Sequence, residues 1–172
     1  IGDEAGYTEL RSDAIAIGTS AQYYGNGSAA IAIGNSAGYE SLGNYAVAIG
    51  RETAYTGSGD GSVAIGDGAL YDGAADYTIA IGKYAGQNGM GYGAVAMGYE
   101  AGYGANQYSV ALGYGAGWGD GGSLGNYQVA IGAYAGSTGG YDNSIVLNAT
   151  GDDFTSTASG LFIKPVRYTE TQ

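Results

Sequence analysis

The sequence contains neither cysteine nor histidine, and it has only one proline and five basic residues among its 172 positions. Without cysteine and histidine, disulfides, thiolate nucleophiles, histidine general bases and His/Cys metal sites are excluded. We therefore expect no cofactor and no bound metal. The 16 acidic residues give a net charge of −11, so nucleic acid, which needs clustered Lys and Arg, is not an expected partner. Long apolar runs are also absent, so we expect no insertion into a membrane.

Glycine is abundant instead, at 36 residues, and it recurs at a fixed spacing. The tetrapeptide Val/Ile-Ala-Ile/Leu/Met-Gly starts at residues 15, 31, 47, 63, 79, 95, 110 and 129, and a degenerate copy, IVLN, starts at 145. Most intervals are 16 residues, with one of 15 and one of 19. An alanine stands three residues after nearly every one of these glycines, and an aromatic residue usually follows two residues later. A fixed short period of this kind predicts a solenoid.

The repeat is too short for the paired helices of helical solenoids, and its tetrapeptide alternates with a period of two, which predicts a strand. Ile15 and Ile17 should then point to one side of the strand and Ala16 to the other. The Ala-Gly-Tyr segment after each turn predicts a second short strand. We expect an all-β parallel β-solenoid of about ten 16-residue coils over residues 1–150, with the large aliphatic side chains inside the coil.

The alanine at the centre of each tetrapeptide would lie on the opposite face of the strand. Alanine is a poor strand former, and a solvent-facing strand favours threonine or charged residues, so an unbroken alanine column favours close packing against another chain. We expect this column to be the interface of a homotrimer, while packing against a second layer of the same chain stays open as the alternative. The column comprises Ala16, Ala32, Ala48, Ala64, Ala80, Ala96, Ala111 and Ala130.

The strings NYAVAIG (44–50), GSVAIG (61–66) and YSVALG (108–113) resemble the repeat of YadA-like heads in trimeric autotransporter adhesins, although the period here is longer. Units such as NYAVAIGRETAY and YTIAIGKYAGQNG, followed by NSIVLNATGDDFTSTASGLFIKPVR at 143–167, look more like repeats of tail-fibre proteins of phages and large algal viruses. These resemblances imply a left-handed parallel β-roll with three chains around one axis. The Ser/Thr/Gly/Asp-rich stretch at 151–160 predicts that residues 151–172 form a C-terminal cap or linker, and the resemblance implies that it leads to a chaperone or stalk region.

The function implied by these resemblances is that of a structural and receptor-binding segment of a trimeric extracellular fibre, such as a viral tail fibre, attaching to a host-surface glycan or protein. The alternatives are the head of a bacterial trimeric autotransporter adhesin on the outer surface, and a glycan-degrading tailspike enzyme. We do not expect an enzyme, because the acidic residues are scattered over the turns and no isolated carboxylate pair stands out. An ice-binding face would be expected to carry a column of threonines, and the sequence contains no such column.

Aromatic side chains are the best candidates for ligand contact, because they supply much of the energy at many interfaces. The regular row from Tyr7 to Trp118 is expected mainly to stack on itself along the coil edge. The less regular aromatics after the turns, and the glycine-rich insertion between Gly113 and Gly132, are better candidates for exposure to a ligand. The candidate ligand-binding residues are Tyr84, Tyr99, Tyr114, Trp118, Asp120 and Tyr134, and no catalytic residue is expected.

Overall fold

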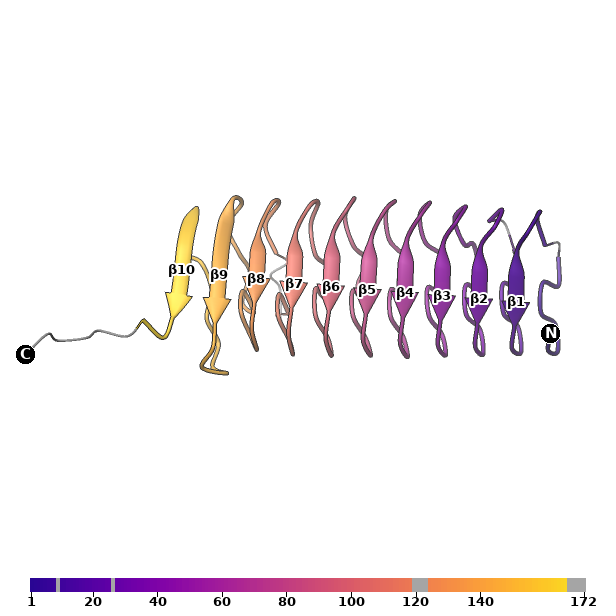
Figure 1. The fold of residues 1–172 in the computed structure, drawn as a ribbon, viewed down its shortest axis with the longest axis horizontal. Helices are drawn as coiled ribbons and strands as arrows, with labels where there is room; N and C mark the ends of the chain where they lie inside the picture. Colours follow the sequence, from indigo (N-terminus) through magenta and orange to yellow (C-terminus); the bar gives the residue numbers. More distant parts are fainter. Residues whose placement is uncertain (9, 26, 119–123, 167–172) are drawn as a thin grey trace, which may run out of the picture.

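The computed structural model describes residues 1–8, 10–25, 27–118 and 124–166. Its strands follow one another in chain order in a single ten-stranded parallel sheet, so that the coils stack into a rod (Figure 1). This arrangement confirms the predicted all-β solenoid. Among the described residues there is no helical segment that could span a lipid bilayer. The strands are β1 (Ile15–Ile17), β2 (Ile31–Ile33), β3 (Val47–Ile49), β4 (Val63–Ile65), β5 (Ile79–Ile81), β6 (Val95–Met97), β7 (Val110–Leu112), β8 (Val129–Ile131), β9 (Ser144–Asn148) and β10 (Gly160–Lys164).

The repeat sets the register of the sheet, because equivalent residues of successive coils lie opposite each other. Val95 pairs with Val110 and Val110 pairs with Val129, although these repeats are 15 and 19 residues long. The irregular intervals are therefore absorbed outside the strands, and the columns of equivalent side chains stay unbroken.

The sheet also continues beyond residue 150, where we expected a cap or linker to begin. β10 pairs with β9, and Leu161 lies opposite Ile145. Phe162 packs against the core, while Leu161 and Ile163 are exposed. β10 ends at Lys164, immediately before Pro165, which has no backbone N–H with which to extend the strand.

The structure reverses our prediction of which side chains lie inside the coil: the alanines are inside and the large aliphatic side chains are outside. The alanine at the centre of each strand points into the coil and exposes at most 5% of its surface, whereas its aliphatic neighbours point outward. The predicted trimer interface at the alanine column is therefore wrong, because these side chains are enclosed within their own chain. The alternative, in which the column faces a second layer of the same chain, is correct. The enclosed residues are Ala16, Ala32, Ala48, Ala64, Ala80, Ala96, Ala111 and Ala130.

The physical reason is the narrowness of the coil. The strand alanines share the core with two further rows of small residues, one just before each strand, as at Ala94, and one after each turn, as at Ala101. Methyl-sized side chains allow the opposite walls of the coil to approach closely from β1 to β8, whereas Val146 and Phe162 occupy the same column in the last two coils. A few larger core side chains fill the remaining space, namely Leu42, Leu70, Met90 and Leu124.

The second strand that we predicted in each coil is not formed, because the Ala-Gly-Tyr segments are turns. Each contains a residue in the left-handed region, such as Ala54 with a φ of 49° and Leu70 with a φ of 51°, which breaks an extended conformation. Backbone hydrogen bonds nevertheless join these turns from coil to coil. The Ala54 N–H donates to the Ala69 carbonyl at 2.8 Å.

The glycine that ends each tetrapeptide is required both by its backbone and by the space around it. Gly66 has a φ of 133°, where L-residues are strained, and a Cβ on it would lie 2.5 Å from the carbonyl oxygen of Gly82 in the next coil. This close approach explains why glycine recurs with the period of the coil.

Candidate functional site

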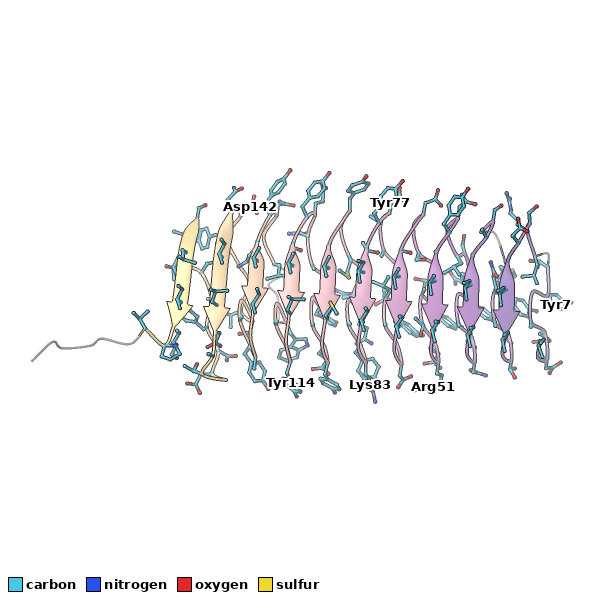
Figure 2. All side chains as sticks on the ribbon, in the orientation of Figure 1. Tyr7, Arg51, Tyr77, Lys83, Tyr114 and Asp142 are labelled. Carbon is cyan, nitrogen blue, oxygen red and sulfur yellow. The ribbon has the colours of Figure 1, made fainter. Side chains whose placement is uncertain are left out.

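The outward side of the sheet carries two columns of aliphatic side chains, which we call the aliphatic face. The columns run the length of the rod and contain only Ile, Val, Leu and Met, all exposed or half-buried in the single chain (Figure 2). One column is Ile15, Ile31, Val47, Val63, Ile79, Val95, Val110, Val129, Ile145 and Leu161, and the other is Ile17, Ile33, Ile49, Ile65, Ile81, Met97, Leu112, Ile131, Leu147 and Ile163.

Turns border the aliphatic face at both ends of the strands. We call the turn that leads into each strand the entry edge and the turn that follows it the exit edge. In Figure 2, Tyr77 and Asp142 lie on the entry edge, while Arg51, Lys83 and Tyr114 lie on the exit edge. Side chains that differ from coil to coil are concentrated on these two edges.

Four of the six predicted ligand-binding residues lie together on the exit edge. Tyr84, Tyr99, Tyr114 and Tyr134 follow β5, β6, β7 and β8, and we call them the exit ladder. Their ring centroids are separated by 6.3, 5.2 and 5.3 Å in chain order. Residues scattered in the sequence thus form one continuous aromatic strip.

The other two predicted residues do not belong to this strip as far as the structure describes them. Trp118 is half-buried and lies four residues beyond Tyr114, in the sequence row that contains Tyr103. Asp120 lies outside the described residues. The glycine-rich insertion that contains Asp120 therefore remains a sequence-based prediction.

A second aromatic strip lies on the entry edge, and sequence reasoning did not single it out. Tyr77, Tyr92, Tyr108 and Tyr127 precede β5, β6, β7 and β8, and we call them the entry ladder. Their ring centroids are 5.5, 5.5 and 5.1 Å apart, and all four side chains are exposed. The signal was a tyrosine two or three residues before the tetrapeptide, whereas our search followed only the residues after it.

Several of these tyrosines occupy backbone positions that favour glycine. Tyr77, Tyr108, Tyr127, Tyr84 and Tyr134 have φ between 54° and 58°. A side chain in the left-handed region costs roughly 1–2 kcal/mol. The corresponding left-handed positions in other coils are filled by several residue types, including Gly61, Gly68, Ser36 and Asn143. The fold therefore does not require tyrosine at these turns, and the ring must contribute through its contacts.

The regular row of tyrosines in the first half of the rod behaves differently. Tyr7, Tyr23, Tyr39, Tyr55 and Tyr71 stack face to face, with centroids 4.7 to 5.1 Å apart and interplanar angles of at most 20°. Desolvation is the first cause that raises the pKa of Tyr23, Tyr39 and Tyr71. This confirms the interpretation that this part of the row stacks on itself.

The exit edge changes from charged to aromatic along the rod. In the earlier coils Arg51 lies 2.9 Å from Asp67, and Lys83 lies 3.6 Å from the same carboxylate. A hydrogen bond from Arg51 to Asp67 is the first cause that raises the pKa of Arg51. The Lys83 ammonium also lies 4.8 Å from the centroid of the Tyr84 ring. This ion ladder ends where the exit ladder begins.

Hydrogen bonds tune two hydroxyls of the exit ladder. A hydrogen bond to the Glu100 carboxylate is the first cause that raises the pKa of Tyr99, and a hydrogen bond with Tyr114 is the first cause that raises the pKa of Tyr134. A tyrosine hydroxyl has one proton, so these two groups can offer a ligand the lone pairs of their oxygens rather than a free donor.

The described residues contain no group of three or more His, Cys, Asp or Glu that could hold a metal ion. What the arrangement offers is a long apolar strip bordered by hydroxyl-bearing rings, which is suited to contact with another molecule. No family model matches the chain, and neither the curated proteins nor the solved structures provide a match.

Proposed function

We propose that this chain is a structural and receptor-binding segment of a trimeric extracellular fibre, in which the aliphatic faces of three copies pack against each other. The observation that carries the proposal is the exposed aliphatic face, which runs along the whole ten-stranded sheet. The interface that we first assigned to the alanine column thus moves to the opposite side of the same strands.

The size of the aliphatic face supports an interface. Ten strands at about 4.8 Å spacing extend over roughly 43 Å, and two side-chain columns cover a width of about 10 Å, so the strip measures roughly 430 Å². The largest apolar patch on a typical monomer covers about 300–600 Å² and is often functional, so a strip of this size marks a candidate contact surface. For comparison, a standard protein interface buries roughly 800 Å² per partner, about twice the area of this strip.

The uniformity of the face points to a second copy as its occupant. Each coil presents the same pair of aliphatic side chains, so copies arranged around an axis parallel to the rod meet like surfaces along their whole length. The charges lie on the turns rather than on this face, so packing would not bury an unpaired charge. Three copies, the viral fibre and the host receptor follow from the resemblance of the repeats and of residues 143–167 to tail-fibre proteins.

The molar mass in solution tests this proposal. We expect light scattering to give three times the 17.1 kDa mass of one chain. Ile79→Lys places a charge at the centre of the aliphatic face without entering the core, and we expect this variant to run as a single chain with unchanged circular dichroism. Asn88→Lys adds the same charge at an exposed turn and should leave the mass at three chains.

A wild-type chain that runs as a monomer would contradict the proposal. If such a monomer also produced thermal hysteresis, the regular face would be assigned to ice instead. Release of reducing sugar from host glycans would favour the tailspike enzyme over a fibre that only binds.

A further inference from the structure

The exit and entry ladders occupy the same four coils. Each of the strands β5 to β8 has a tyrosine in the turn before it and another in the turn after it, so rings border the aliphatic face on both sides along these four strands. Tyr77 and Tyr114 mark the two borders in Figure 2. We call the eight tyrosines of the two ladders the tyrosine zone.

We propose that the tyrosine zone binds an uncharged glycan chain that lies along the rod axis. This inference rests on the proposed function, because it names the class and the position of the receptor that the fibre would contact. It concerns the edges of the rod, whereas the proposed trimer contact concerns the aliphatic face between them.

The ladders suit an oligosaccharide for two reasons. Tyrosine offers an apolar ring face for the C–H side of a pyranose and a hydroxyl for its oxygens. Ring centroids along each ladder are 5.1 to 6.3 Å apart, comparable with the repeat of an extended sugar chain. One sugar unit per coil would therefore meet one ring at each step, although some neighbouring rings are stacked and others are edge-on.

The charge distribution favours a neutral glycan over an anionic one. Residues 77–134 contain one cation, Lys83, and two acidic residues, Glu100 and Asp120, a net charge of −1, whereas the whole chain carries −11. A charge-poor aromatic surface offers no cationic cluster to pair with sialic or uronic acid carboxylates. The negative charge of the rest of the rod repels such polymers.

Calorimetric titration with defined oligosaccharides tests the inference on the assembled protein. The neutral probes are cellohexaose and chitohexaose, and the anionic probe is the hexamer of galacturonic acid. We expect at least one neutral hexamer to bind roughly tenfold more tightly than its own monosaccharide, because several rings contribute at once, and the anionic hexamer not to bind. Binding of neither neutral hexamer, or tighter binding of the anionic one, would overturn the inference.

Paired variants locate the site. Tyr99→Ala combined with Tyr114→Ala removes two exit-ladder rings that have ordinary backbone conformations, and we expect roughly tenfold weaker binding of the neutral hexamer with an unchanged molar mass. Tyr45→Ala is the matched control, because Tyr45 is the most exposed tyrosine of the entry edge, at 72%, but lies outside the tyrosine zone. Equal weakening by Tyr45→Ala would overturn the inference, as would a fall of the double variant to single chains, which would assign the ladders to the subunit interface.

The two proposals fail in different ways. If the wild-type protein is a trimer but does not bind the neutral hexamers, the glycan inference is overturned and the trimer proposal stands. A wild-type monomer that binds them, with loss of binding in the Tyr99→Ala/Tyr114→Ala variant, overturns the trimer and leaves the glycan site.

Discussion

The two faces of the sheet carry side chains of opposite size. The inward face presents alanine in nearly every coil, almost wholly buried, while the outward face presents Ile, Val, Leu and Met in a partly exposed array. A globular domain usually buries its large aliphatic residues first. In this rod the core is filled mainly by alanine methyl groups, and the larger aliphatic side chains lie on the outside, where another molecule can contact them. This arrangement supports the proposed assembly.

The two faces also differ in the contacts that they provide. The inward face provides contacts within one chain, and the outward face could provide contacts between chains. Within a chain, closely packed alanines and backbone hydrogen bonds between successive coils hold the rod together, as in the 2.8 Å bond from the Val63 N–H to the Thr78 carbonyl. The outer columns contribute little to that closure. Apart from Leu161, their side chains already expose less than half of their surface in the single chain, and the apolar area that remains is covered only when another molecule packs on it.

The largest effect that we expect comes from enlarging an inward side chain. Ala80 is fully buried in β5, so Ala80→Leu should overpack the coil and reduce the free energy of unfolding by about 3 kcal/mol. The neighbouring change Ile79→Leu conserves volume on the outward face and should cost less than about 1 kcal/mol. Urea unfolding followed by circular dichroism measures both. Equal tolerance of the two changes would contradict the assignment of inside and outside.

The repeat alone was sufficient to predict the solenoid, the strand at each tetrapeptide and its register, but it also predicted a second strand in each coil that is not formed, and it gave no sign of β10. The repeat could not show which face of the strand is inward. Alternation places Ala80 and Ile79 on different faces, but it does not say which of the two faces the core. That choice depends on the width of the coil, which is set by the turns. Residues such as Ala54 and Leu70 adopt a left-handed backbone conformation in these turns, which alanine and leucine do not predict.

The site was predictable in part for a similar reason. Tyr84, Tyr99, Tyr114 and Tyr134 were identified individually because they follow the turn glycine, but they stand one or two residues after it, so the sequence offers no single column. The structure joins them because rings from adjacent offsets reach each other across one coil spacing. The entry ladder was missed, although its offset before the tetrapeptide is nearly as regular.

A smaller effect should distinguish a covered tyrosine from an exposed one. The Tyr39 ring stacks between Tyr23 and Tyr55 with centroids 5.0 and 4.9 Å away, so Tyr39→Ala should lower the free energy of unfolding by about 2 kcal/mol. Tyr45→Ala removes a highly exposed ring and should change it by no more than roughly 0.5 kcal/mol. Thermal unfolding of both variants checks the difference. A larger loss with Tyr45→Ala would contradict the covered and exposed assignments of the two rows.

The smallest effect concerns alkaline pH. Burial raises the pKa of Tyr39, and the hydrogen bond to Glu100 raises that of Tyr99, so both phenols ionise above the value of about 10 for free tyrosine. Because the folded-state pKa is raised, the resulting stabilisation is complete below about pH 10 and is lost as the pH rises through the folded-state value. Glu100→Gln should return the Tyr99 pKa toward 10 and leave Tyr39 unchanged, as NMR titration of the ring carbons would report. A fall in both pKa values would mean that a single long-range field, rather than two local causes, controls the rings on the two halves of the rod.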